Sequence, residues 1–443
     1  MPALRSILRP FTVTATAAAM LAAAPAAALA AIDLTPPRRV SAPSSWTVGN
    51  AIGRSDAYLH TAGVSDCPPP TGACATDSGP FVSVFWQRSQ IASAPRWSDP
   101  KRVSPAGAHA VRPSIATAGT RVYVAWATQT SYLKYRPKAP RRVWIRVGSQ
   151  QGGSWSAPVA LSGVTTRADY PVVAASGSAV WVVWTAADTG AIRMATSADA
   201  GASWTTTTIG TTTSGRASPE GFAGYPAIGA SGSNLLAAWF AAPGGRQVAL
   251  TSDTGGDDWS ATPTPTRISG ASPNDGNRYP VVRGADDGVS DRVAVGYTTA
   301  TGVAARVFDG VTLSGQVDVD GPWPVTASGH RWAGATGASI APFGADGLAA
   351  AYAACRSRPG VKDPCLRPDA KGARIDVIYR ESSDGGASWS SRRTIARATR
   401  TSRVNEAVSL QADGPSGLRW FTWLGRTNTW TSYRVLGRSA RST

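Results

Sequence analysis

Arginine, carboxylate and tyrosine side chains recur where the chain leads into a series of predicted β-strands. The openings "RPSIATAG" and "YPVVAASG" begin at Arg112 and Tyr170, and Asp169 directly precedes the tyrosine. A guanidinium binds a carboxylate or sulfate through two parallel hydrogen bonds, and a neighbouring carboxyl group could serve as a general acid or base. These residue types predict recognition of an anionic ligand, with acid–base chemistry as a second option.

The other units supply equivalent candidates. We expect ligand binding by Arg112, Arg278, Arg331, Arg403, Tyr170 and Tyr279, and catalytic roles, if the chain has turnover, for Asp169, Glu220 and Tyr225. In the first unit, the corresponding residues are Arg54 and Asp56. Most glycosidases need two carboxyl groups, and Asp169 with Glu220 are candidates for that pair. The alternative is that Tyr-Pro and Arg-Pro only begin strands, with Arg–Asp pairs linking neighbouring units.

The strands that must position these residues are repeated. Segments that alternate apolar residues and finish on an aromatic residue end at Trp86, Trp126, Trp184, Trp239, Tyr297, Tyr352 and Trp423. Each belongs to a unit with a strand before it, a third strand and a short fourth strand. Four antiparallel strands per unit at this period predict an all-β fold, a β-propeller with seven four-stranded blades. Six blades plus an irregular unit is the alternative, because the units around Trp86 and Tyr297 depart from the pattern.

The two ends of the chain are predicted to meet. The last unit supplies only three strands, whereas "PRRVSAP" at 37–43 resembles the fourth-strand segment "PKRVSPAG" at 100–107. We therefore expect the N-terminal strand to complete the last blade and remove open sheet edges. The segments leading into the first strands then share one face with the loops between second and third strands. The basic insertion "TSYLKYRPKAPRR" at 130–142 falls on that face and could contact an anion.

A turn of the form Ser-x-Asp-x-Gly-x-x-Trp precedes the fourth strand in two units. Its residues are Ser197, Asp199, Gly201 and Trp204 in one copy, and Ser382, Asp384, Gly386 and Trp389 in the other. Weaker copies are "GSQQGGSW" at 148–155 and "SDTGGDDW" at 252–259, where Thr254 takes the aspartate position. Short polar side chains bond turn N–H groups, and glycine permits positive φ. We therefore expect a structural role for the motif.

This motif resembles the Asp-box, or BNR, repeat of secreted bacterial sialidase-like β-propellers. The resemblance implies that the turn lies opposite the ligand-binding face. Sialidases of this family use three arginines for the substrate carboxylate, a tyrosine paired with glutamate, and an aspartate as acid/base. Their first arginine belongs to a Phe/Tyr-Arg-Ile-Pro motif, which "VRPSIA" matches only at Arg112, without the isoleucine. The remaining partners have no motif match, and seven units differ from the family's six.

The N-terminus indicates export. Arg5 and Arg9 precede an alanine-rich run, and "ALA" at 28–30 offers a cleavage site, so we expect residues 1–31 to be a signal peptide and 32–443 a single propeller domain. Removing the two arginines lowers the net charge from +17 to +15, which favours anionic partners. In an exported chain we expect disulfides Cys67–Cys74 and Cys355–Cys365, although four cysteines permit three pairings.

Three functions follow. The first is a secreted propeller that binds a glycan or another anionic polymer without turnover. The second is a glycoside hydrolase, sialidase-like or acting on another sugar, and the third is a protein-interaction scaffold at the cell surface. We expect no cofactor, no bound metal, no nucleic acid partner and no membrane span, with a monomer as the default.

Overall fold

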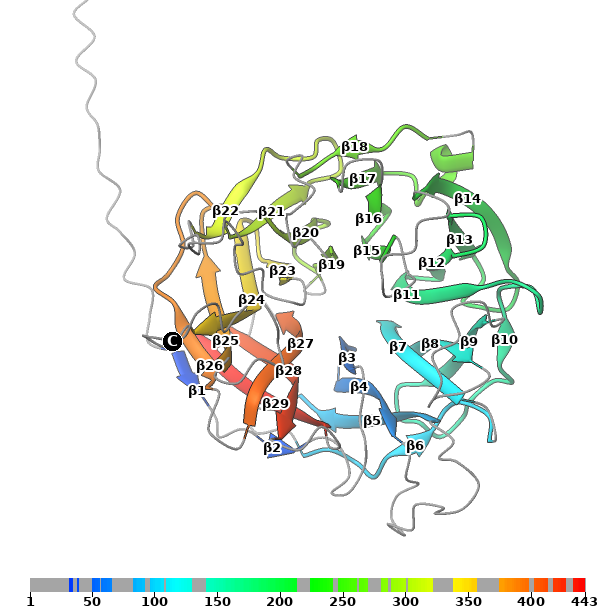
Figure 1. Ribbon diagram of the computed structural model, residues 1–443, viewed down its shortest axis with the longest axis horizontal. Helices are drawn as coiled ribbons and strands as arrows, with labels where there is room; N and C mark the ends of the chain where they lie inside the picture. The colour runs from blue at the N-terminus through cyan, green and yellow to red at the C-terminus, as the bar shows by residue number, and fades with distance from the viewer. Residues whose placement is uncertain are drawn as a thin grey trace, which may run out of the picture.

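A computed structural model gives the arrangement of the chain (Figure 1). It describes residues 32–34, 38–39, 50–55, 57–65, 83–91, 96–106, 109–129, 141–212, 224–241, 246–260, 263–269, 280–285, 288–299, 302–321, 338–356, 374–397, 402–412, 417–427 and 433–442. Their regular elements are β-strands and one short 3₁₀-helix, η1 (Asp257–Ser260). Among these residues no helix is both long and apolar enough to cross a membrane.

Five four-stranded antiparallel sheets follow one another along the chain. The first two contain β3 (Asn50–Arg54), β4 (Tyr58–Ser65), β5 (Ser83–Gln90) and β6 (Lys101–Arg102), then β7 (His109–Ala118), β8 (Arg121–Gln129), β9 (Arg142–Ser149) and β10 (Val159–Ala160). The third and fourth contain β11 (Ala168–Ser176), β12 (Ala179–Ala186), β13 (Ala191–Ser197) and β14 (Thr205–Thr211), then β15 (Ala227–Ser231), β16 (Asn234–Ala241), β17 (Arg246–Ser252) and β18 (Thr266–Arg267). The fifth contains β19 (Val281–Gly284), β20 (Val293–Thr298), β21 (Val303–Phe308) and β22 (Val317–Asp320).

The sixth sheet has nine strands and holds both chain ends. One antiparallel group is β23 (Ser339–Phe343), β24 (Gly347–Arg356), β25 (Arg374–Ser382) and β26 (Arg393–Ala396); the other is β27 (Ser402–Ala412), β28 (Leu418–Thr427) and β29 (Tyr433–Ser442). One parallel pair, Ile375 with Val404, joins the groups. β1 (Ile32–Leu34) and β2 (Arg38–Arg39) both pair with β29.

The all-β propeller and its closure by an N-terminal strand are confirmed. β2 lies within the predicted segment 37–43 and pairs antiparallel with β29. The first strands of the sheets surround the centre, from β3 through β7, β11, β15, β19 and β23, and β27 contacts β3 to close the ring (Figure 1). Seven separate blades are not confirmed: the described strands form six sheets, as in the alternative, because the pair between β25 and β27 joins the last two groups.

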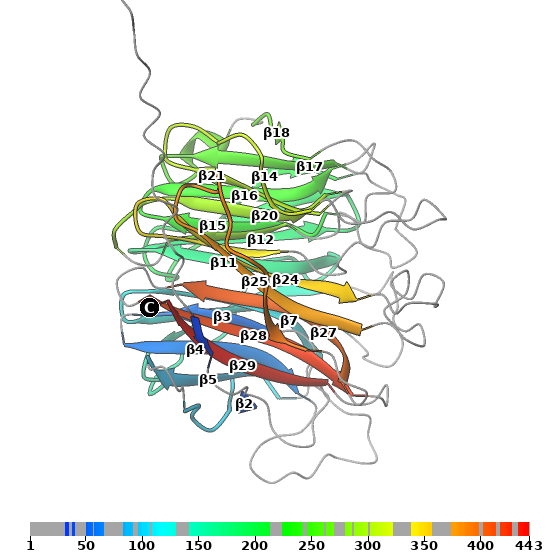
Figure 2. The ribbon, with the colours of Figure 1, turned by 90° about the vertical axis from the view of Figure 1, so that its left-hand side faces the viewer.

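Each sheet is buried on both faces because it packs between two neighbours (Figure 2). On β12, Trp181 and Val183 pack in a cluster with the fourth sheet, whereas Val182 and Trp184 pack in a cluster with the second. Successive strand residues point to opposite faces, so such a strand needs apolar residues at consecutive positions. This explains why "VWVVW" lacks the apolar–polar alternation of a half-exposed strand.

The first sheet differs from the prediction in one respect. Trp86 lies on β5, the third strand of its sheet, and not on the second. The second strand is β4, where His60 is buried and stacks on Trp86 with ring centroids 5.8 Å apart. Arg54 therefore ends the first strand, where its carbonyl oxygen accepts a hydrogen bond from Thr117 near the end of β7. The expectation that Arg54 leads into the first strand on the ligand face was wrong.

The two polar turns close the third strands β13 and β25. Ser382 Oγ donates to Asp384 Oδ1 at 2.7 Å, and the backbone N–H groups of Gly386 and Ser388 donate to Ser382 Oγ and Asp384 Oδ1. Gly386 has φ +97°, and a Cβ atom there would lie 2.8 Å from Val317. The other turn repeats these bonds with Ser197, Asp199 and Gly201. Trp204 and Trp389 pack against the cores beside the turns.

The weaker copy at 252–259 replaces its missing aspartate. Thr254 stands where the motif has a carboxylate, and Asp258 supplies one from four residues later. Ser252 Oγ donates to Asp258 Oδ1 at 2.5 Å, and Thr254 Oγ1 donates to the same oxygen at 3.2 Å. The turn thus keeps its carboxylate acceptor although the sequence pattern is broken.

Candidate functional site

Three neighbouring sheets present one unusual backbone conformation where the first strand begins. Arg112 in β7, Tyr170 in β11 and Tyr225 just before β15 have φ of +54°, +56° and +37°. Each precedes a proline, and the register shifts around the first two. Positive φ is uncommon outside glycine, and each such residue costs about 1–3 kcal/mol unless its surroundings hold it in place. The surroundings of these three residues therefore hold each of them in a backbone conformation that a residue with a Cβ atom disfavours.

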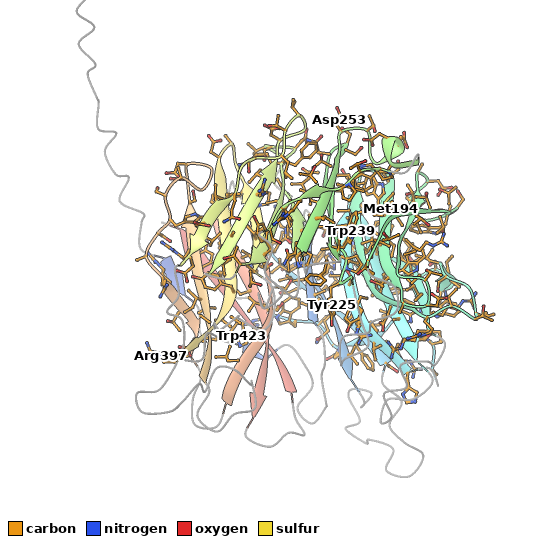
Figure 3. The ribbon with its side chains drawn as sticks, turned by 45° about the horizontal axis from the view of Figure 1, so that its top comes forward. Met194, Tyr225, Trp239, Asp253, Arg397 and Trp423 are labelled. Carbon is orange, nitrogen blue, oxygen red and sulfur yellow. The ribbon has the colours of Figure 1, made fainter. Side chains whose placement is uncertain are left out.

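The three side chains contact one another from sheet to sheet. The Arg112 guanidinium carbon lies 3.8 Å from the centre of the Tyr170 ring, and Arg112 Nη2 donates to the Tyr170 hydroxyl at 3.0 Å. Tyr170 and Tyr225 meet edge to face, with ring centroids 4.6 Å apart. We call Arg112, Tyr170 and Tyr225 the Arg–Tyr–Tyr ladder. Figure 3 places Tyr225 toward the middle of the molecule, whereas Asp253 and Arg397 lie at its periphery.

Asp169 forms hydrogen bonds with two members of the ladder, Arg112 and Tyr170. Its carboxylate is fully buried and accepts hydrogen bonds from Arg112 Nη1 on one oxygen and Arg141 Nη1 on the other. The Tyr170 backbone N–H also donates to Asp169 Oδ1 at 2.9 Å. A buried charge is tolerated when it is paired and hydrogen-bonded in this way. Asp169 therefore acts as an ion-paired acceptor, whereas the Arg112 side chain remains 30% exposed.

The Arg112 guanidinium keeps its positive charge over the physiological pH range. Burial lowers the pKa of its guanidinium, but the charge of Asp169, followed by Tyr170 and the Asp169 hydrogen bond, raises it, so that the pKa lies above its ordinary value. A guanidinium of raised pKa stays protonated at any physiological pH. The exposed part of the ladder thus carries a permanent positive charge beside two half-buried aromatic rings.

A close backbone approach sets the position of Tyr225. Gly224 has φ +114°, and a Cβ atom there would lie 2.7 Å from Thr185 Oγ1 of β12. The Gly224 carbonyl oxygen accepts the Phe240 N–H of β16 at 2.7 Å. The third and fourth sheets therefore fix the residue before Tyr225, and only glycine leaves room for their contact.

Some of the site residues predicted from the sequence lie in this cluster, and others lie outside the residues that the structure describes. Asp169, Tyr225, Arg112 and Tyr170 all lie in the cluster above. Glu220, Arg278, Tyr279 and Arg331 lie outside the described residues, as do Asp56, Cys67, Cys74 and Cys365. Arg403 is in β27 and Cys355 in β24, but their side chains are also outside them. Among the described residues, no three His, Cys, Asp or Glu side chains are grouped to hold a metal ion.

Sequence reasoning missed the burial of Arg141. It was assigned to the basic insertion 130–142, yet its side chain is only 4% exposed and ion-paired with Asp169 of the next sheet. Its expected role as a solvent-facing anion contact was wrong. The only available signal was its position: it stands immediately before a third strand, and that end of the strand meets the next first strand.

A tyrosine–glutamate pair does occur, but on the other face. The Tyr379 hydroxyl donates to Glu381 Oε1, which also accepts from Arg419 Nε at 2.8 Å. Glu381 directly precedes the turn at 382–389, and all three side chains are buried. Burial, then the charge of Glu381, raises the pKa of Tyr379 well above its usual range. This group stabilises the packing of β25 against β28 and offers no reactive surface.

Similarity to known proteins is confined to solved structures. No family model and no curated protein matches the sequence. Among solved structures, Trypanosoma rangeli sialidase in complex with sialic acid matches 91% of this chain and 59% of its own length, with TM-score 0.45 and 9% identity. Phage phi92 endosialidase matches 92% and 69%, with TM-score 0.49 and 10% identity. Hadza microbial sialidase Hz136 matches 90% and 66%, with TM-score 0.43 and 10% identity. The assignment of the chain as a β-propeller rests on its own sheets. The chain spans about 59% of the length of the T. rangeli protein.

Proposed function

We propose that the protein is a secreted β-propeller that binds an acidic glycan or another anionic polymer through the Arg–Tyr–Tyr ladder, without turnover. The observation that carries this proposal is the Arg112 guanidinium, held on the Tyr170 ring at 3.8 Å and still 30% exposed. It could bind a carboxylate or sulfate group of a ligand through parallel hydrogen bonds. The adjacent tyrosines could pack against the apolar face of a sugar.

The long-range field supports an anionic ligand. The whole chain has a net charge of +17, and the chain without residues 1–31 would have +15. A field of this sign raises the local concentration of a polyanion and accelerates its encounter with the protein. Its contribution would weaken as salt is added, whereas the paired contact at Arg112 would be screened less.

The environment of Asp169 argues against catalysis by that residue. A general acid must carry a proton near neutral pH and reach the leaving oxygen. Asp169 is fully buried, and both of its carboxylate oxygens already accept hydrogen bonds from guanidinium groups, so neither oxygen is placed to reach a leaving group. Hydrolysis would therefore need other carboxyl groups, such as Glu220. A glycoside hydrolase remains the alternative function.

The deciding experiment compares binding and turnover on the same ligands. Calorimetry would use 3′-sialyllactose, trigalacturonate and a chondroitin sulfate tetrasaccharide, with lactose as the neutral partner of the first. We expect binding of at least one acidic probe, and Arg112→Met should weaken it about tenfold or more, because it removes a charged hydrogen-bonding group. Arg121→Met is the control, since Arg121 is exposed on β8 and its Nη1 donates to Ala200 O at 3.1 Å.

Turnover is measured with 4-methylumbelliferyl sialoside and a panel of other 4-methylumbelliferyl glycosides. We expect no product. Product that disappears in Arg112→Met would establish the hydrolase instead, and absence of both binding and turnover would favour the cell-surface scaffold. N-terminal sequencing of the chain recovered from culture medium tests secretion, with a start near residue 31 or 32 expected.

A further inference from the structure

Arg141 is fixed at its backbone as well as at its side chain. It stands just before β9, and it forms a parallel bridge with Arg167 in the segment leading into β11. Arg141 N–H donates to Thr166 O at 2.9 Å, and Ala168 N–H donates to Arg141 O at 3.1 Å. The third strand of the second sheet is thereby tied to the residues immediately before Asp169.

The two oxygens of Asp169 divide their partners between the two arginines. Oδ2 accepts from Arg141 Nη1, whereas Oδ1 accepts from Arg112 Nη1 and from the Tyr170 N–H. Because Oδ2 is held by a backbone-fixed and almost fully buried group, the carboxylate plane cannot turn freely. Oδ1 is thereby presented to Arg112 in one orientation.

The orientation of Arg112 then follows from Asp169. With Nη1 on the carboxylate, Nη2 reaches the Tyr170 hydroxyl at 3.0 Å and the guanidinium plane lies over the ring. Without Arg141, one oxygen of a buried carboxylate loses this donor, and leaving such a group poorly satisfied is costly. The carboxylate would then be free to turn, and the Arg112 guanidinium, which is oriented through Oδ1, would lose its fixed place on Tyr170.

We propose that Arg141 is a positioning residue for the ligand site: it acts through Asp169 to orient Arg112, and it does not itself contact the ligand. This inference rests on the proposed function for its effect on affinity, but the orientation of Arg112 can be measured without any ligand. The exposed fractions of the two side chains agree with these roles: Arg141, at 4%, is buried away from a ligand, whereas Arg112, at 30%, can reach one.

The ligand-free test is the rate at which phenylglyoxal modifies Arg112, followed by peptide mass spectrometry. Arg141→Met removes the donor at similar length, and Arg141→Lys keeps the charge but loses the planar fork. We expect Arg112 to react several times faster in Arg141→Met and at an intermediate rate in Arg141→Lys. Arg146 is the internal reference, because it lies in the same sheet and bonds Val103 O and Ser156 O.

The second readout is the affinity for 3′-sialyllactose, trigalacturonate or the chondroitin sulfate tetrasaccharide, whichever the wild type binds. Arg141→Met should weaken it about tenfold, the cost of disturbing one charged hydrogen-bond pair, and Arg141→Lys should recover part of the loss. An unchanged Arg112 rate in Arg141→Met would overturn the proposal. Equal acceleration of Arg112 and Arg146 would also overturn it, because that result means general loosening. If the wild type binds none of the probes, the proposed function fails while the modification rates still decide the role of Arg141.

Discussion

Arg380 of β25 reaches across to the preceding sheet, where its Nη1 donates to the carbonyl oxygen of Val319 in β22 at 2.6 Å. Its Nε donates to Ser390 O within its own unit at 2.6 Å. Arg146 of β9 repeats the arrangement, with Nη1 on Val103 O at 2.9 Å and Nε on Ser156 O at 2.6 Å. A guanidinium on the third strand thus joins the outer segments of two adjacent units.

These contacts predict a stability effect without a binding effect. Arg146→Met and Arg380→Met should each lower the free energy of unfolding by about 1–3 kcal/mol, because each leaves carbonyl acceptors between sheets without a charged donor. Urea unfolding monitored by tryptophan fluorescence measures it. The two losses should add in the double variant, since the sites share no partner.

Arg121→Met serves as the comparison for these variants. Arg121 is exposed and its bond to Ala200 O is 3.1 Å long, so its loss should change stability by less than about 0.5 kcal/mol. Equal effects of all three substitutions would show that the bonds between sheets contribute no more than a surface arginine does.

Much of the fold could be predicted because each sheet is buried on both faces. That condition produces runs such as "VWVVW" on β12, and the likeness of "PRRVSAP" to fourth-strand segments predicted the pairing of β2 with β29. The same condition misled the assignment of the first sheet. Second and third strands are both buried on two faces, so the pattern ending at Trp86 could not show that it belongs to β5. Joining of the last two groups depends on the single pair of Ile375 with Val404, which leaves no mark on local sequence.

For the candidate site, the sequence predicted the residue types and the end of the strands at which they lie. It did not predict which of these side chains contact one another. Arg112, Asp169, Tyr170 and Tyr225 were named as candidates because each stands where a first strand begins. That Arg141 would share Asp169 with Arg112 depends on how neighbouring units pack, and no spacing within one unit carries that information. The positive φ values could not be predicted either. A residue before proline prefers an extended backbone with negative φ, so the positive values must be imposed by this packing.

We expect Asp384, in the turn after β25, to make the free energy of unfolding depend on pH in the acid range. Hydrogen bonds from Ser388, then from Ser382, lower the pKa of Asp384 to about 2. Its folded pKa lies below the ordinary value of 3.8, so its contribution is present above pH 3.8 and is lost as pH falls toward 2. Asp384→Asn should therefore destabilise the protein at pH 7 and make little difference at pH 2.

Thermal unfolding of the Asp384→Asn variant and the wild type across pH 2–7 makes this comparison. Binding of the acidic probes at pH 7 should be the same in both proteins, because the turn lies at the opposite end of the strands from the ladder. A constant difference in unfolding temperature across the range would contradict the role given to the carboxylate.

His60 predicts a second pH dependence, in a higher range. Burial, then the charge of Arg88, lowers the pKa of His60 to about 3, and Ser55 Oγ lies 3.0 Å from its Nε2. The unfolded chain binds a proton near the ordinary pKa of 6.5 and the folded chain does not. Stability from neutral His60 is therefore full above pH 6.5 and falls by up to about 1.4 kcal/mol per pH unit below it.

The measurement is urea unfolding at half-unit steps from pH 7.5 to pH 5 for the wild type and His60→Gln. Glutamine does not titrate, so the wild type should lose stability more steeply than the variant below pH 6.5. His109→Gln is the control: burial lowers the pKa of His109 as well, but by less, and its removal should change the slope less. Parallel curves for the wild type and His60→Gln would refute the assignment.

Substitutions at Tyr225 can distinguish the effect of its strained backbone from the effect of its side chain. Its φ of +37° is unfavourable for any residue with a Cβ atom, and glycine adopts such values freely. Tyr225→Gly should therefore be more stable than Tyr225→Ala by about 1 kcal/mol, the reverse of the usual order in strands. Both variants lose the ring against Tyr170, so both should weaken binding of the acidic probe to the same extent. Trp144 of β9 is half-buried and does not have positive φ, so Trp144→Ala should be more stable than Trp144→Gly. The same order at both positions would show that the Tyr225 backbone is not strained, and a difference in probe affinity between Tyr225→Gly and Tyr225→Ala would show that backbone conformation itself shapes the site.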